Sequence, residues 1–177
     1  MLKKCLLFGF LYLVCWQIVD AQTFTVVTPS NHTVYFQLDN GTAKATYNTY
    51  NMPNYGSSLT GTLIIPDSVE YNGVIYPVTA IGDYAFHHSY GIDTVILPNT
   101  ITAINTEAFC ACADLKSVAI PNSVITLGNL AFAACHQLSD MTIGESVVTI
   151  GNQAFDADTS LVTVVIPNSV VSIGQSA

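Results

Sequence analysis

The chain has 177 residues, of which half are hydrophobic and only 9% are charged, and its formal net charge is −8. This composition excludes an intrinsically disordered chain, which needs low hydrophobicity and high charge, and the length allows one domain of ordinary size. The four basic side chains are all lysines, and two of them are Lys3 and Lys4. Binding to nucleic acid or to anionic lipid draws on lysine and arginine, so the sequence predicts neither partner.

Residues 1–21 have the pattern of a secretory signal peptide. A positive start that includes Lys3 and Lys4 precedes an uncharged apolar run over residues 5–16, and a cleavage site before Gln22 follows. Two alternatives stay open: lipid attachment at Cys15, and an uncleaved membrane anchor. Cleavage leaves two lysines and eleven acidic residues. We expect export to the cell surface or beyond, with no membrane insertion of the mature chain.

Residues 22–75 are predicted to form a small β-rich region that caps the rest of the chain. Residues 33–38 and 42–47 flank Asp39-Asn40-Gly41, and Asn72-Gly73 separates residues 69–71 from residues 74–76. Both patterns are typical of β-hairpins, because Asn and Gly accept the positive φ of tight turns. The polar stretch 48–58 is predicted to be a loop. An independent binding role is the alternative to capping.

From residue 76 to residue 177 the sequence repeats with a 23-residue period, and the last repeat is incomplete. An Ile-Gly pair or a close relative precedes each Ala-Phe pair, and an aliphatic run that ends in Pro98, Pro121, Gly144 or Pro167 follows it. Self-similarity at a fixed period predicts a solenoid in which successive units stack and share one core. The repeated Ala-Phe pairs are Ala85-Phe86, Ala108-Phe109, Ala131-Phe132 and Ala154-Phe155.

Each unit can be interpreted as a strand, a bend, a second extended piece and a short helical turn. In one unit, residues 115–120 alternate as a half-buried strand does, and Pro121 ends the strand because it lacks an N–H group. Stacking predicts that the phenylalanines form one column. The helical turn is expected to begin at a residue with good N-cap character, and these residues are Asp83, Thr106, Asn129 and Asn152.

The unit LKSVAIPNSVITLGNLAFAAC resembles the BspA-like class of bacterial leucine-rich repeats over residues 76–177. The resemblance implies a right-handed leucine-rich-repeat solenoid of short parallel β-strands and short helical turns, exported to the cell surface. It also implies a role in adhesion, as in some members of the class. The class shares no catalytic motif, so no catalytic residue is carried over and we expect no enzyme. Departures from the repeat pattern are Ser89, Asn105, Gly144 and Asp158.

Cysteine and histidine do not form a predicted metal or catalytic site, and no cofactor is expected. Cys112 and Cys135 hold the same repeat position, so they are either a disulfide or a pair of small buried residues, and Cys110 is an odd thiol beside them. His87 and His88 are adjacent and cannot both face one way from a helical turn. We therefore expect solvated or helix-end histidines rather than ligands.

The concave sheet is the candidate binding surface, for a protein or a surface glycan whose recognition or adhesion would be the function. A structural spacer that displays another segment is the alternative, with this face merely solvated. The last unit stops before its Ala-Phe pair, which predicts a fragment or a missing downstream cap. The outward residues of the sheet form two stripes: Thr94, Ser117, Asp140 and Thr163, and beside them Ile96, Ala119, Thr142 and Val165.

Overall fold

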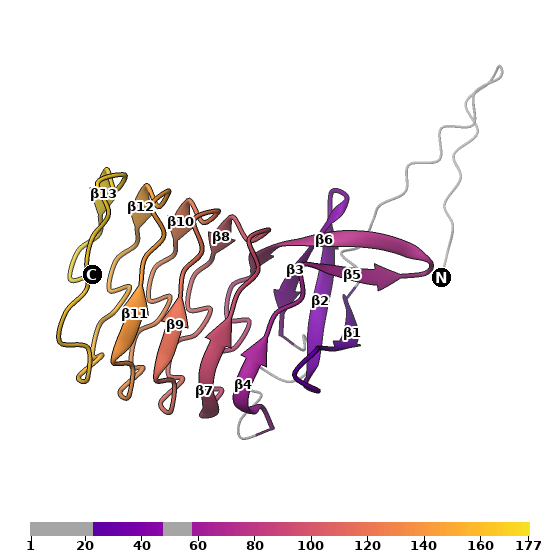
Figure 1. Ribbon diagram of the computed structural model, residues 1–177, viewed down its shortest axis with the longest axis horizontal. Helices are drawn as coiled ribbons and strands as arrows, with labels where there is room; N and C mark the ends of the chain where they lie inside the picture. The colour runs from indigo at the N-terminus through magenta and orange to yellow at the C-terminus, as the bar shows by residue number, and fades with distance from the viewer. Residues whose placement is uncertain (1–22, 48–57) are drawn as a thin grey trace, which may run out of the picture.

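The computed structural model describes residues 23–47 and 58–177. These residues form a row of stacked coils with two sheets on different sides (Figure 1). The predicted signal peptide and most of the predicted loop at 48–58 lie outside the described residues. In the part that is described, no helix is long and apolar enough to cross a lipid bilayer.

A nine-stranded sheet carries the N-terminal strands into the repeats. Its strands pair in the order β1-β2-β3-β6-β8-β10-β12-β13, and β5 pairs with β6 outside this path. The strands are β1 (Thr23–Val27), β2 (Thr33–Asp39), β3 (Thr42–Thr46), β5 (Ser68–Tyr71), β6 (Val74–Ile81), β8 (Ala103–Ile104), β10 (Thr126–Leu127), β12 (Thr149–Ile150) and β13 (Ser172–Ile173).

A four-stranded parallel sheet forms the second side, in the order β11-β9-β7-β4. Neighbouring strands pair at an offset of one repeat, so that Val95 lies beside Val118 and Val118 beside Met141. All three side chains point into the core and are buried. The strands are β4 (Thr60–Ile64), β7 (Gly91–Ile96), β9 (Ser117–Ala119) and β11 (Asp140–Thr142).

Both predicted hairpins are confirmed. Strands β2 and β3 pair antiparallel around Asn40 and Gly41, and β5 pairs antiparallel with β6 around Asn72 and Gly73. All four turn residues have positive φ, as the tight hairpin turn requires. From the first hairpin, β3 pairs in parallel with β6, and this joins the N-terminal strands to the repeats in one sheet.

The predicted helical turns are wrong, because the described residues contain no helix. In the first coil, the N–H groups of Tyr84, Phe86 and His88 donate to carbonyls of the next coil, and the N–H groups between them donate to the carbonyl three residues back, which closes tight turns. Tyr84 and His88 have φ of 57° and 60°, which no α-helix allows. Later coils repeat this pattern, with positive φ at Glu107, Ala111, Leu130, Ala134, Gln153 and Ala157.

The expected N-cap residues therefore have a different role. Asp83 Oδ1 accepts a hydrogen bond from the backbone N–H of Thr106 at 3.0 Å, and Asn129 Oδ1 accepts one from Asn152 at 2.8 Å. Asn152 does the same for Gln175 at 2.7 Å. These side chains join one coil to the next instead of capping helices. The short polar side chains were correctly expected to accept hydrogen bonds from free backbone N–H groups, because such groups are found in tight turns as well as at helix ends.

The phenylalanine column is confirmed. Ring centroids lie 5.1 Å apart between Phe86 and Phe109, 5.3 Å between Phe109 and Phe132, and 6.2 Å between Phe132 and Phe155, and all three pairs are stacked. The first three rings are fully buried, whereas Phe155 is only partly buried. The column thus runs through the core and joins all four coils that carry an Ala-Phe pair.

Replacing Phe132 with Ala should lower the free energy of unfolding by about 3–5 kcal/mol, because it removes a buried ring that stacks on two others. Phe155→Ala is the matched control and should cost clearly less, since that ring is partly exposed. Urea denaturation followed by circular dichroism measures both values. Equal losses would contradict a column whose interior rings carry the greater share of the packing.

Candidate functional site

The candidate surface is the outer face of the four-stranded sheet, which we call the sheet face. It comprises the solvent-facing side chains of β4, β7, β9 and β11. The register places Thr94 beside Ser117, Ser117 beside Asp140, and Ala119 beside Thr142. Residues one repeat apart in the sequence thereby become neighbours in two rows. The structure brings together six of the eight predicted residues in this way.

Side chains on the sheet face are mostly small and uncharged. Ile96, Ala119, Asp140 and Thr142 are exposed, while Thr94 and Ser117 are half-buried. The hydroxyl of Ser117 donates to Asp140 Oδ2 at 3.1 Å, which fixes the carboxylate against the neighbouring strand. Asp140 is therefore a fixed acceptor and negative charge within a row that otherwise offers methyl and hydroxyl groups. Such a face suits contacts and hydrogen bonds with a partner's backbone or hydroxyl groups.

The two remaining predicted residues lie outside the sheet. Thr163 and Val165 are exposed in the segment that follows β12, where the structure has no strand. Val162 and Val165 are 93% and 78% exposed there. This coil therefore adds exposed apolar side chains next to the sheet face, but it forms no strand that pairs with β11.

Sequence analysis missed the contribution of β4. The register pairs Thr62 with Thr94 and Ile64 with Ile96, which extends both rows of the sheet face by one strand. The signal was present, because the run from Leu63 to Pro66 resembles the run from Val95 to Pro98. The β5–β6 hairpin lies between these two runs and separates them by more than one repeat, so a search at a fixed period passes over the first of them.

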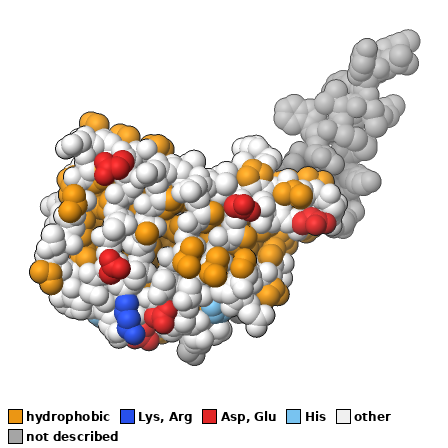
Figure 2. Space-filling view, in the orientation of Figure 1, with side chains coloured by type: hydrophobic (Ala, Val, Ile, Leu, Met, Phe, Trp, Pro, Cys, Tyr) orange, Lys and Arg blue, Asp and Glu red, His pale blue; other side chains and the backbone are white. Residues whose placement is uncertain are grey.

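Figure 2 shows hydrophobic and uncharged side chains over most of the visible surface, with a few separate acidic groups and one basic group. Strands β4, β7, β9 and β11 lie side by side across the front of the same view in Figure 1. Charged groups therefore do not dominate this side of the molecule. Recognition here would depend on shape, apolar contact and a few hydrogen bonds.

Cys112 and Cys135 are free thiols and fully buried, which agrees with their interpretation as small core residues. Each Sγ donates a hydrogen bond at 3.2 Å, from Cys112 to the carbonyl of Phe86 and from Cys135 to that of Phe109. Burial raises the pKa of Cys112 to about 12 and that of Cys135 well above its ordinary value. Both thiols are therefore neutral, and they are poor nucleophiles.

Histidines lie at three places in the structure: at His32, at His87 and His88, and at His136. His32 bridges the Ser30 hydroxyl and the carbonyl of Thr60, at 2.9 Å each, and so holds the β1–β2 turn against β4. The expectation that His87 and His88 must face different ways is wrong, because their rings stack with centroids 4.0 Å apart. It assumed helical geometry, which the positive φ of His88 excludes.

The cysteine position of the repeat holds Asp158 in the fourth coil. Asp158 Oδ1 accepts a hydrogen bond from the backbone N–H of Cys135 at 2.8 Å. Burial, assisted by the negative charge of Asp156, raises the pKa of the Asp158 carboxyl to about 7, and the hydrogen bond from Cys135 offsets part of this effect. Between its ordinary pKa and pH 7, this carboxyl is therefore protonated in the folded chain and ionised in the unfolded chain.

Asp158→Asn should make the protein more stable than wild type at pH 8, with an advantage that shrinks as the pH falls from 7 toward 4. The folded pKa lies above the unfolded one, so the native carboxyl is favoured only while it is protonated, and wild-type stability falls as the pH rises through this window. The amide keeps the acceptor for Cys135. Urea denaturation at pH 4, 6 and 8 measures the difference, and an advantage that does not vary with pH would contradict the assignment.

Comparisons with known proteins match the repeats to a protein family and to solved structures. Residues 77–177 match six copies of a family model described as "BspA type Leucine rich repeat region". A solved leucine-rich cell surface protein from Faecalibacterium prausnitzii is 29% identical, with a TM-score of 0.60 over 86% of this chain and 45% of that one. The pneumococcal vaccine antigen PcpA is 14% identical, with a TM-score of 0.56 over 85% of this chain and 46% of that one, and shares the fold. The chain thus spans about half the length of each. A comparison with curated proteins found no match.

Proposed function

Because this chain belongs to the family of BspA-type leucine-rich-repeat proteins, we propose that it is an exported recognition protein at the cell surface. Its ligand would be a protein or a surface glycan, held on the sheet face. The predicted signal peptide and the similarity to a leucine-rich cell surface protein support the location.

One observation carries the proposal: the sheet face presents two rows of like side chains at the regular spacing of parallel strands, about 4.8 Å. Thr62, Thr94 and Ser117 continue into Asp140 along one row. A rigid surface of this kind binds an extended or flat partner without first having to order itself. Ile96 adds an exposed apolar contact at the centre of the neighbouring row.

The N-terminal strands would serve as the cap of the solenoid. The backbone N–H of Gly82 donates to the carbonyl of Ala45 at 2.8 Å, and β3 pairs with β6. Val34, Phe36, Ala43 and Ala45 are all fully buried. A terminal coil needs such a cover, because its own apolar face would otherwise meet water.

Asp140→Lys combined with Thr142→Lys should weaken ligand binding at least about tenfold, because two long charged side chains would cover the β11 side of the sheet face. Both residues are exposed, so folding should be unaffected. Binding is measured by biolayer interferometry against a panel of immobilised extracellular-matrix proteins and on a glycan array.

Glu145→Lys is the matched control, since it makes the same acid-to-lysine change at an exposed position of the same coil but off the sheet face. It should leave binding within about twofold of wild type, as expected for a charge away from the contact. Equal binding by wild type and the double variant would favour the spacer function, in which this chain only holds another segment away from the surface.

A further inference from the structure

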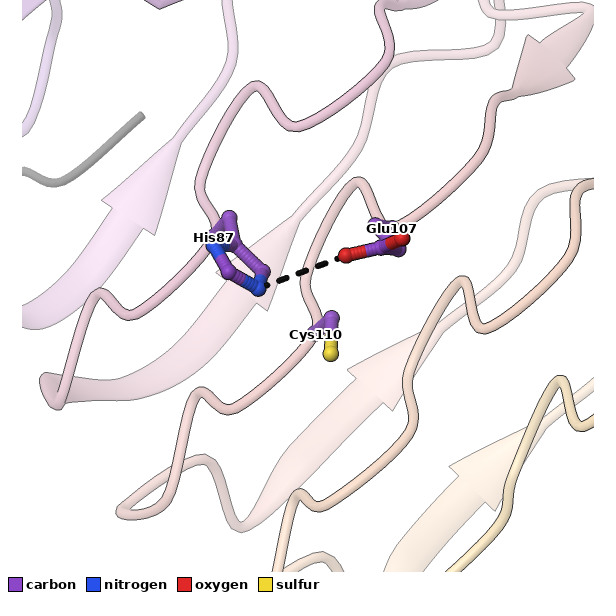
Figure 3. A group of neighbouring side chains, drawn as sticks. All are labelled: His87, Glu107 and Cys110. Atoms are coloured by element: carbon purple, nitrogen blue, oxygen red, sulfur yellow. Dashed lines mark ion pairs between the residues drawn. The ribbon is translucent and has the colours of Figure 1, made fainter. Parts of the chain in front are cut away.

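The turn side of the first two coils gathers four chemically unusual residues into one cluster. Tyr84 and His87 come from the first coil, and Glu107 and Cys110 occupy the same two repeat positions in the second. Because coils stack in register, Glu107 lies beside Tyr84, and Cys110 lies beside His87. Side-chain donor atoms of His87, Glu107 and Cys110 all fall within 4.8 Å of one another, and Figure 3 shows His87 and Glu107 pointing toward each other with Cys110 beside them.

We propose that His87, Glu107 and Cys110 form a binding site for a borderline divalent cation of the zinc type. Imidazole nitrogen, thiolate sulfur and carboxylate oxygen are the three ligand types that Zn²⁺ takes from proteins. The thiolate disfavours Mg²⁺ and Ca²⁺, which prefer oxygen ligands. Three protein ligands leave a fourth position open for water or for a group from a partner.

The distances suit this ion. Bond lengths of about 2.0–2.3 Å in tetrahedral geometry place neighbouring ligand atoms about 3.3–3.6 Å apart. His87 Nε2 and Glu107 Oε2 are 3.4 Å apart. All three residues are half-buried, so the site is screened from bulk water yet open to an entering ion. The remaining adjustment is a rotation of the Cys110 side chain, whose Sγ lies within 4.8 Å of the other two ligand atoms.

Neighbouring side chains hold the ligands in place. Tyr84 lies beside Glu107, whose negative charge raises the pKa of the tyrosine hydroxyl. The His87 ring is enclosed by two other rings, with Tyr84 edge-on at 5.9 Å and His88 stacked at 4.0 Å. Orienting contacts of this kind are what metal ligands usually have around them.

The site belongs to one pair of coils. At the same two repeat positions the third coil has Leu130 and Ala133, and the fourth has Gln153 and Asp156. Repeat packing therefore does not require ligating side chains here. Glu107 also brings a negative charge to the site, which attracts a cation.

Titration of the purified, reduced chain with ZnCl2 should show one site by calorimetry. CoCl2 should give a thiolate-to-cobalt charge-transfer band in the near ultraviolet. Cys110→Ser should remove that band and weaken Zn²⁺ binding at least about tenfold, and His87→Ala should weaken binding similarly, because each removes one of three ligands. A large excess of Mg²⁺ should not displace the ion.

His136→Ala is the matched control, because it removes an exposed histidine on a different coil, whose Nδ1 hydrogen bonds to the backbone carbonyl of Ala157 at 3.0 Å. It should leave Zn²⁺ affinity unchanged. Glu107→Gln preserves shape and decides the case if Cys110→Ser fails to fold, which circular dichroism reveals. Absence of binding, absence of the charge-transfer band, or equal affinity in wild type and these ligand variants would overturn the proposal.

Discussion

Each coil must stack in register with its neighbours, because its backbone hydrogen bonds are made mainly to the coils before and after it. On the turn side, the N–H groups of Phe86 and Phe109 donate to the carbonyls of Ala108 and Ala131 in the following coil. The N–H group of Gly128 donates in the opposite sense, to the coil before. A coil that was longer or shorter by a single position would leave such groups unpaired in a buried setting, which costs more than a missed surface bond.

Packing reinforces the same constraint from within. The stacked rings of Phe109 and Phe132 are nearly parallel, with an interplanar angle of 8°, so each coil presents its ring at the same angle. The thiols of Cys112 and Cys135 satisfy carbonyls on the same column by equivalent bonds. Asp158 replaces this donor by a carboxyl and titrates near neutral pH as a result. Where the pattern is broken, the structure thus acquires a new chemical property.

Period and hairpin signals predicted most of the fold from the sequence. The repeat step, the phenylalanine column and the Asn-Gly turns are local or strictly periodic, and both kinds of pattern can be read along the chain. Helical turns were predicted in error, because the spacing of Ala131, Phe132 and Cys135 fits a helical face as well as it fits consecutive tight turns. The distinction depends on where each N–H group finds its partner, and only the neighbouring coil decides that.

The candidate sites divide in the same way. Six residues of the sheet face follow from the repeat, whereas β4 was missed because the β5–β6 hairpin interrupts the period. The 23-residue spacing places Glu107 beside Tyr84 and Cys110 beside His87, but the direction of these side chains depends on the turn geometry, which the sequence predicted wrongly. Helical geometry also gave a wrong reason to separate His87 from His88.

Repetition and irregularity make different contributions to this molecule. A row of equivalent threonines and aliphatic residues gives a partner several nearly identical places to bind, which supplies contact area but little selectivity. Selectivity needs positions at which one coil differs from the next, and Asp140 supplies such a difference on the sheet face. On the turn side, His87, Glu107 and Cys110 do so for a single pair of coils. The even stacking that makes the repeats alike is also what brings their exceptions together, because side chains in adjacent coils meet only when the register is kept.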